Sequence, residues 1–439
     1  MQTLEEKKLI EHIRFRPGMY LGTLGNGDYY SDGIYRMFQE ILNFSIDEFR
    51  QGYGNIIEVQ VEDNHIISIR DYGRGVPYKE RTWNEKSFLR TTGVTLESEL
   101  SINIVKSLCS QFDISYFKDN SVYRLNYDNG ILKDELIENI ETENGTLIVF
   151  TPDENIFKGF RYVENIVFSI LRDVTYLNTG LDIIFNGIRM KSTDGMFDLV
   201  KDKMPRKGYF LYPVIRFKND SLDIAITHSR SEVEKCYSFV NGLYTNLGGT
   251  HLSSLKKVVS SVILELYPSC VFIEEDVYSG MVIAISINME HPMFESVNRW
   301  KLGSLYFTED GSCTIEKYIH TFFCEKFKTF LLEHPDISNI ILEKIALTRN
   351  HRKFAQKCLS MSIGELVKLW NDGIENQTLG TKELYSIRDA LLAKKVQTVE
   401  MQRSNAIAKR LKIGYDKVFN IIHCSGRFFS ETDGVLLPF

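Results

Sequence analysis

The sequence lacks the features that mark several large classes of protein. The formal net charge is −6, so no overall positive field points to nucleic acid, although a locally basic surface is compatible with this total. The seven cysteines are scattered, without a C-x-x-C pair or a metal-site spacing with histidine, which predicts reduced thiols in a cytoplasmic protein. No apolar run is long enough to span a bilayer, and the charged start "MQTLEEKKLIEHI" does not resemble a signal peptide.

Internal repeats and low-complexity segments are absent as well. The chain has 439 residues, of which 43% are hydrophobic and 25% are charged, and this is the composition of an ordinary globular protein. A chain of this length predicts two or three domains, each large enough to bury its own core.

The apolar pattern of the first 205 residues predicts both helices and strands. Apolar and polar residues alternate on either side of Asp63 and Asn64, which predicts a hairpin within 55–77. Two long helices that flank strands favour an α+β sandwich. The predicted helices are 4–14, 31–51 and 98–110, and a further strand is predicted at 145–152.

The second half of the chain has a different pattern. The segment "MPRKGYF" predicts a linker at 204–210. Strands are predicted to predominate from about 209 to 300, and a helical pattern follows from about 314 to 358. The remainder of the chain is predicted to be mostly helical.

The predicted helix 31–51 carries polar side chains along an otherwise apolar pattern. Glu40, Asn43 and Asp47 fall at positions i, i+3 and i+7, and Phe44 falls at i+4, so all four lie near one helix face. This face has two interpretations, namely a solvated polar stripe or part of a functional site.

Asp71 favours the functional interpretation. It ends a predicted strand and enters a loop that contains Gly73 and Gly75. Glycines allow the backbone to approach a flat ligand closely, and the carboxylate can accept a hydrogen bond from an exocyclic amine. The sequence therefore predicts a ligand-binding loop beside the helix.

Several motifs together resemble one family. "RPGMYLG", "EILNFSIDEF", "RDYGRGVP" and "GTLIVFTP" occur in the order and spacing of the B subunits of bacterial DNA gyrase and topoisomerase IV. "SFVNGLYTNLGGTHL" and "DVYSGMVIAISINMEHPMFESVNRWKLGS" are similar to the transducer domain of that family. The resemblance covers roughly residues 14–358.

The resemblance implies an α+β fold with a GHKL (Bergerat) ATPase sandwich, then a ribosomal-S5-like transducer domain, then a helical C-terminal segment. The implied boundaries are 1–205, 209–358 and 359–439. The resemblance also implies ATP and Mg²⁺ as cofactors.

The same resemblance implies roles for individual residues. Glu40 matches the general base that polarises the attacking water, and Arg299 matches a lysine that contacts the γ-phosphate. Asp71 matches the aspartate that binds the adenine amino group, and Thr146 matches a threonine that supports this contact. The implied nucleotide-binding residues are Asn43, Asp47, Asp71, Gly73, Gly75, Pro77 and Thr146.

The sequence departs from the family at the metal ligand. The family has its Mg²⁺-binding asparagine four residues after the glutamate, where this chain has Phe44, which offers no oxygen to a hard cation. Asn43 lies one residue earlier and within roughly 60° of Glu40 around the helix. Two alternatives remain open, that Asn43 supplies the metal ligand or that Phe44 fills the metal site.

A second departure concerns the glycine-rich lid that wraps the phosphates in the family. The corresponding segment is "TTGVTLESELSINIVKSL", where only Gly93 remains, and the lid segment is shorter than usual. Glu97 and Glu99 fall where phosphates would lie, and their charge would oppose an anion. Alternatively they stabilise a helix N-terminus that Thr95 or Ser98 caps.

Further departures affect the transducer and the N-terminus. The family's Gln-Thr-Lys loop corresponds to Val297, Asn298 and Arg299, so that the positive charge persists as arginine, which can donate to two phosphate oxygens. The stretch before Arg16 is short, which predicts a reduced arm contact between the two copies in a dimer.

The expected cleavage machinery is absent. No acidic TOPRIM motif follows residue 360, so DNA cleavage would require TOPRIM-bearing and A-type subunits on separate chains. The segment 404–422 resembles a helix-turn-helix loosely, and a small packed helical cap is the simpler interpretation.

Two functional hypotheses therefore stand. The first is an ATP-operated, homodimeric clamp subunit that captures a DNA segment for strand passage, and Glu40, Asp71, Thr146 and Arg299 support it. The second is a non-hydrolysing paralogue that acts as a dimeric DNA- or protein-binding module, and Phe44, Glu97 and Glu99 support it.

Overall fold

The computed structural model describes residues 4–75, 96–203, 209–269, 271–296, 299–376, 378–394, 429–432 and 435–438. The chain divides into two compact units. The first consists of Met1–Ile263 and Gly280–Thr329, and the second of Leu264–Ser279 and Phe330–Phe439. The predicted linker at 204–210 lies largely outside the described residues, and the predicted domain boundaries stay predictions.

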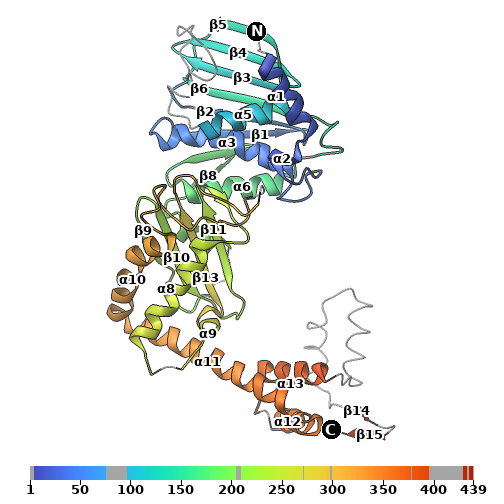
Figure 1. The fold of residues 1–439 in the computed structure, drawn as a ribbon, viewed down its shortest axis with the longest axis vertical. Coiled ribbons are helices and arrows are strands. Elements are labelled where there is room, and N and C mark those ends of the chain that lie inside the picture. The colour runs from blue at the N-terminus through green and yellow to red at the C-terminus, as the bar shows by residue number, and fades with distance from the viewer. Residues whose placement is uncertain are drawn as a thin grey trace. The chain divides into compact units, whose positions relative to one another are not determined.

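The first unit contains a large mixed sheet. Within the described residues it has eight strands in the order β5-β4-β3-β6-β2-β1-β7-β8 (Figure 1). Neighbouring strands run antiparallel except β1 and β7, which are parallel. The strands are β1 (Ile56–Glu62), β2 (Ile66–Asp71), β3 (Cys109–Lys118), β4 (Ser121–Asp128), β5 (Ile131–Asn139), β6 (Gly145–Pro152), β7 (Asp182–Phe185) and β8 (Ile188–Met190).

The hairpin of β1 and β2 confirms the prediction from the alternating pattern. Asp63 and Asn64 form its turn with φ angles of 48° and 60°, a conformation that these two residue types adopt more readily than most. Strand β2 also pairs with β6, and this register sets Asp71 opposite Thr146. Two residues that are distant in the sequence are thereby neighbours across a strand pair.

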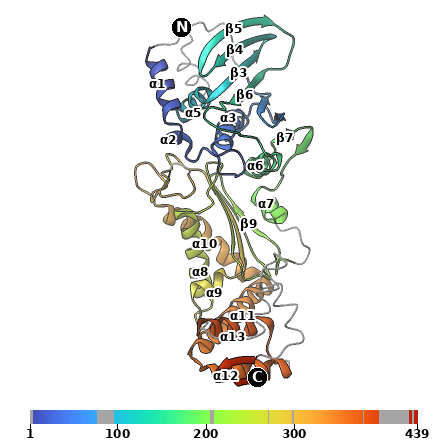
Figure 2. The ribbon, with the colours of Figure 1, turned by 90° about the vertical axis from the view of Figure 1, so that its right-hand side faces the viewer.

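Helices cover one face of this sheet. Helix α3 (Gly33–Arg50) contacts β2 and β6 as well as α5 (Leu96–Ser107), and α1 (Leu4–Phe15) packs beside α5 (Figures 1 and 2). The apolar stripe of α3, which includes Ile34, Phe38 and Ile41, is buried because the helical period brings these side chains to the sheet. The remaining helices of this region are α2 (Gly18–Leu21) and α6 (Glu164–Leu177).

Two of the three predicted helices match the structure closely, namely 4–14 and 31–51. The third prediction, 98–110, runs too far. Helix α5 ends at Ser107 because the chain enters strand β3 at Cys109, which pairs with Pro152 at the end of β6. The apolar residues at this junction satisfy either pattern, so only the strand pairing decides the boundary.

A second sheet of the first unit has five described strands, in the order β12-β11-β13-β10-β9. Its strands β11 and β13 are parallel, which requires a long crossover connection. Helix α8 (Thr250–Leu266) lies within that connection, although strands were predicted to predominate there. The other described elements of this region are β9 (Ile215–Lys218), β10 (Leu222–His228), β11 (Lys235–Val240), β12 (Leu243–Tyr244), β13 (Met281–Ile287) and α7 (Met196–Lys203). Helix α9 (Glu274–Tyr278) belongs to the second unit.

The predicted helical stretch from 314 to 358 is two helices, α10 (Ile315–Glu333) and α11 (Pro335–Ser360). The break falls at His334 because Pro335 has no amide hydrogen and occupies the first position of α11. Within the second unit, Arg352 of α11 donates two hydrogen bonds, of 2.9 and 2.8 Å, to the buried carboxylate of Asp276 on α9.

The second unit has its own small core. Helices α12 (Ile363–Glu375) and α13 (Thr381–Ala393) pack with α11 around Trp370. The described residues near the end of the chain form an antiparallel hairpin, β14 (Phe429–Thr432) and β15 (Val435–Pro438), which the sequence pattern does not predict. The helix-turn-helix-like segment 404–422 lies outside the described residues. In the part of the chain that the structure describes, no helix has the length and apolar character needed to cross a membrane.

Candidate functional site

The polar face of α3 lines a cavity of about 680 Å³ in the first unit. Glu40, Asn43 and Asp47 contribute to one wall of this cavity. The segment that follows β13 contributes other lining residues, including Phe294 and Arg299. Four residues that were predicted separately from the sequence therefore share one concave site. They are three side chains with a carboxylate or an amide and one arginine, and ligands usually bind at such concave sites.

Asp71 lies in a second group of predicted residues, at the end of β2. Its Oδ1 accepts hydrogen bonds from the backbone N–H of Gly73 (3.0 Å) and of Thr146 (3.1 Å), and its Oδ2 accepts one from the Ser45 hydroxyl (3.0 Å). The side chain is buried, and burial raises the pKa of Asp71 to about 6, while the three hydrogen bonds oppose this shift. Asp71 and Thr146 are not among the residues that line the 680 Å³ cavity.

The loop after Asp71 is fixed by close packing. Gly75 has a φ of +62°, and a Cβ atom at this position would lie 1.8 Å from the carbonyl oxygen of Phe117. A side chain is therefore excluded on two grounds, the backbone conformation and the available space. Pro77 falls outside the described residues, so its predicted role in this loop is not tested.

A partly buried ion pair, which the sequence pattern did not reveal, holds the same loop. Arg74 Nη2 lies 2.6 Å from Glu48 Oε1, and the Arg74 backbone N–H donates to Glu48 Oε2 at 3.0 Å. Hydrogen bonding to Glu48 raises the pKa of Arg74. The sequence did contain one indication of this contact. Glu48 follows Asp47 by one residue on α3, and this step turns its side chain toward the side of the helix that contacts β2.

Phe44, which replaces the family's metal-binding asparagine, belongs to the hydrophobic core. Its side chain is only 4% exposed, and it packs in the core that α3 forms with the eight-stranded sheet. It is not among the residues that line the cavity, whereas its neighbour Asn43 is. The helix thus turns the aromatic ring toward the sheet and the amide toward the cavity.

Glu40 is paired with a residue that was not among the predicted site residues. Arg36 precedes it by one helical turn on α3, and Arg36 Nη2 lies 2.6 Å from Glu40 Oε1. The two side chains are 15% and 14% exposed, so that most of this ion pair is removed from water. The spacing i, i+4 was the available signal, since residues four apart on a helix are neighbours.

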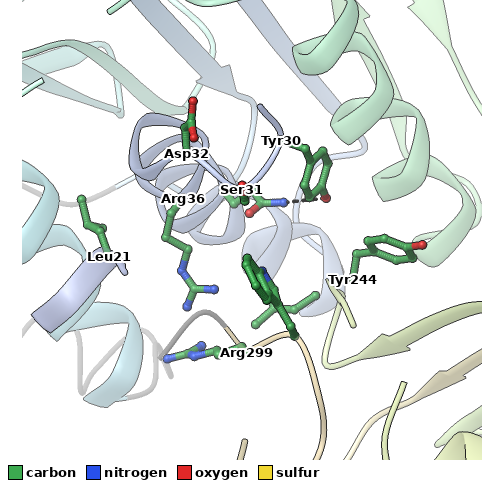
Figure 3. A pocket seen from close by; sticks show the side chains of 10 residues that line it. Leu21, Tyr30, Ser31, Asp32, Arg36, Tyr244 and Arg299 are labelled. Carbon is green, nitrogen blue, oxygen red and sulfur yellow. Dashed lines mark hydrogen bonds between the residues drawn. The ribbon is translucent and has the colours of Figure 1, made fainter. Parts of the chain in front are cut away.

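Arg299 approaches the same place from a distant part of the sequence. It has a φ of +54°, which is uncommon for a residue with a side chain. Figure 3 shows its guanidinium group near that of Arg36, and both side chains line a small pocket of about 40 Å³ that also includes Tyr30 and Trp300. Val297 and Asn298, which the resemblance matches to the rest of the family's loop, lie outside the described residues, as does the predicted lid segment between Pro77 and Gly93.

The cavity offers few ligands for a Mg²⁺ ion. No cluster of three or more carboxylate, histidine or cysteine side chains with metal-binding geometry occurs in the described ranges. A magnesium ion bound with nucleotide needs only one or two oxygen ligands from the protein, because phosphates and water supply the others. Asn43, which lines the cavity beside Glu40, fits this requirement, and Phe44 does not.

The raised pKa of Asp71 leads to a prediction about stability. A carboxyl group whose pKa is higher in the folded state binds its proton more tightly there, so its contribution to stability is full below its unfolded pKa of about 3.9 and is lost as pH rises through about 6. We expect Asp71→Asn to gain about 2 kcal/mol in free energy of unfolding relative to the wild type between pH 4 and pH 7.5. Urea denaturation at both pH values measures this difference.

Ser45→Ala is the matched variant for this prediction. It removes the hydroxyl that donates to Asp71 Oδ2 and so should shift the pH dependence toward higher pH, because the ionised carboxylate loses a hydrogen bond. An Asp71→Asn variant whose stability relative to the wild type is the same at both pH values would show that Asp71 does not titrate in this range.

Comparisons with known proteins agree on one family. A family model described as DNA gyrase B matches residues 186–359. The DNA topoisomerase 4 B chain of Borreliella burgdorferi is 30% identical over 387 residues, which cover 83% of this chain and 63% of that protein. The DNA gyrase B chain of Helicobacter pylori is 27% identical over 394 residues, which cover 81% of this chain and 49% of that protein. This chain therefore spans half to two thirds of the length of these relatives.

Solved structures give the same result for the fold. The 43K ATPase domain of Thermus thermophilus gyrase B, in complex with an aminocoumarin, matches with a TM-score of 0.62 and 22% sequence identity. The match covers 79% of this chain and 96% of that domain. At this level of identity the likeness establishes the predicted α+β GHKL fold and not a ligand.

Proposed function

We propose that this chain, which in sequence and fold is like the B subunits of type IIA topoisomerases, is an ATP-binding clamp component of such an enzyme. In this proposal nucleotide binding drives two copies to dimerise around a DNA segment, and hydrolysis reopens the clamp. An A-type partner subunit is proposed to take part in the cleavage of DNA.

The observation that carries the proposal is the hydrogen bonding of Asp71. Two backbone N–H groups and the Ser45 hydroxyl hold its carboxylate in one orientation. Among the described residues Ser45 is the one donor to Oδ2, which therefore has a lone pair for a further donor. A buried carboxylate that is fixed in this way suits the exocyclic amine of adenine. Gly75 fixes the course of the loop after Asp71, since a Cβ atom there would lie 1.8 Å from the carbonyl oxygen of Phe117.

The cavity supports an assignment of the remaining groups. Glu40 is the proposed general base, which accepts a proton from the attacking water, and Arg299 is the proposed partner of the terminal phosphate. Asn43 and Asp47 are proposed to contact the nucleotide from the same wall. Asn43 would hold Mg²⁺, and the ion would neutralise phosphate charge when bound.

The test is a calorimetric titration of the full chain with a non-hydrolysable ATP analogue, with and without Mg²⁺. We expect micromolar binding that strengthens with the metal, because the phosphates carry several negative charges. Asp71→Asn, which keeps the shape of the side chain, should weaken binding by about tenfold or more, since a hydrogen bond to a charged group is worth about 1.5–3 kcal/mol. Absence of heat at high protein concentration would refute the proposal.

A second candidate function is a non-hydrolysing paralogue that acts as a dimeric DNA- or protein-binding module. Phe44 favours it, because the family's metal position carries a buried aromatic ring here. The Arg36–Glu40 ion pair favours it as well, because Arg36 contacts the carboxylate that would have to contact the attacking water. This candidate predicts no turnover, whether or not the analogue binds.

A further inference from the structure

Two guanidinium groups and one carboxylate meet at the boundary of the two cavities. Arg36 and Arg299 both line the small pocket of about 40 Å³, and Figure 3 shows their charged ends near each other. Arg299 and Glu40 also line the larger cavity of about 680 Å³. The two cavities share Arg299 and Leu243, so that they are neighbouring parts of one site.

Arg36 and Arg299 bring two positive charges to this boundary, and the larger cavity is also lined by Asp47, Arg50 and Glu290. Glu40 is the ion-pair partner of Arg36, and among the described residues no carboxylate forms an ion pair with Arg299, whose side chain instead lies 5.9 Å from the ring of Phe294. Asp32 also lines the small pocket, but its Oδ2 accepts hydrogen bonds from the backbone N–H groups of Gly27 and Tyr29. Burial and the nearby Arg299 both lower the pKa of Arg36, while Glu40 opposes the shift.

Two guanidinium groups that lie near each other can bind one anion between them. Guanidinium groups match the geometry of phosphate oxygens, to which each can donate two hydrogen bonds. A pocket of about 40 Å³ is too small for a nucleotide, so the anion must lie at its mouth, within the larger cavity. Arg36 can reach that point by rotation of its side chain, because its partner Glu40 already lines the larger cavity.

We infer that Arg36 is a positioning residue that exchanges its ion pair with Glu40 for the terminal phosphate of a bound nucleoside triphosphate, which it holds together with Arg299. In the nucleotide-free chain Arg36 keeps Glu40 occupied. A triphosphate draws Arg36 away and so breaks this ion pair, and Glu40 then accepts a proton from the attacking water, whereas a diphosphate leaves the ion pair in place. The inference rests on the proposed function and adds to it a reason why Glu40 acts only when a triphosphate is present.

If Arg36 exchanges partners in this way, two substitutions should change the affinity for a triphosphate in opposite directions. Arg36→Gln removes a donor to the terminal phosphate, so we expect the affinity for a non-hydrolysable ATP analogue to fall about tenfold or more, while that for ADP changes less than about twofold. Glu40→Gln removes the competitor for Arg36, so we expect the affinity for the analogue to rise about threefold or more. Calorimetric titration of the full chain with both nucleotides measures each value.

Three further variants make the test specific. The double variant Arg36→Gln with Glu40→Gln should show no gain over Arg36→Gln alone, because the competition no longer exists. Arg36→Lys should recover part of the lost affinity, since lysine keeps the positive charge but cannot donate two parallel hydrogen bonds as a guanidinium group does. Arg161→Gln is the control, because it removes an arginine from an exposed ion pair with Asp28, outside both cavities.

The outcomes separate this inference from the proposed function. If Arg36→Gln weakens ADP binding as much as analogue binding, Arg36 only maintains the structure, and the inference is wrong. An unchanged affinity in Glu40→Gln would overturn it as well. In both cases binding of the analogue by the wild type would leave the proposed function standing. A wild type that binds no nucleotide would overturn both.

Discussion

We expect Glu40→Gln to retain binding of the ATP analogue and to lose hydrolysis by a factor of about 10² to 10⁴. The factor is that of a missing general base, since glutamine has the shape of glutamate but accepts no proton near neutral pH. Glu40 is the only carboxylate among the described residues that both lines the 680 Å³ cavity and pairs with Arg36. Phosphate release under steady-state conditions, measured beside calorimetric binding, tests the expectation.

The control for this prediction is Glu62→Gln. Glu62 is an exposed carboxylate at the end of β1, so its substitution removes the same charge from the same unit without a change in the cavity. Hydrolysis by this control should equal that of the wild type. A Glu40→Gln variant that still hydrolyses ATP at the wild-type rate would remove Glu40 from the mechanism, and Asp47, on the same face of α3, would become the carboxylate to examine.

The two functional hypotheses differ in what they expect of the wild type. The clamp hypothesis expects slow but measurable turnover, because the Arg36–Glu40 ion pair must separate before water can be activated. The paralogue hypothesis expects no turnover above the level of Glu40→Gln. A comparison of the hydrolysis rates of the wild type and Glu40→Gln therefore decides between the two hypotheses. The result does not depend on whether the protein binds DNA.

The local features of the site could be predicted from the sequence. A polar face on an otherwise apolar helix is visible from spacing, and Glu40, Asn43 and Asp47 do line one cavity. The hairpin turn at Asp63 and Asn64 follows from the alternation of residues on either side. Both features depend on neighbours within one or two turns or strands, which is the range where periodicity is informative.

Features that depend on distant contacts could not be predicted in this way. The strand order, with β7 beside β1 and β6 between β2 and β3, joins segments that are far apart in the sequence. The approach of Arg299 to Arg36 brings the segment after β13 to helix α3, and no spacing rule relates these positions. The position of Phe44 relative to the core depends on how α3 is rotated about its axis. The packing of α3 against the sheet determines this rotation, and the sequence of the helix alone does not.

The last prediction concerns Phe44. We expect Phe44→Asn, the change that would restore the family's metal ligand, to lower the free energy of unfolding by about 3–5 kcal/mol. The ring is 4% exposed within the main core, so its removal leaves a cavity, and the new amide has no water to bond with. Urea denaturation measures the loss.

Phe44→Leu is the matched control, because leucine keeps the position apolar and fills most of the space. We expect it to cost about 1–1.5 kcal/mol, so that the remaining difference from Phe44→Asn measures the burial of the amide. The opposite result, a stable Phe44→Asn protein that binds the ATP analogue more tightly with Mg²⁺, would mean that helix α3 can rotate to present position 44 to the cavity. In that case the loss of asparagine would have weakened a metal site that the fold still retains, and Asn43 would not be its replacement.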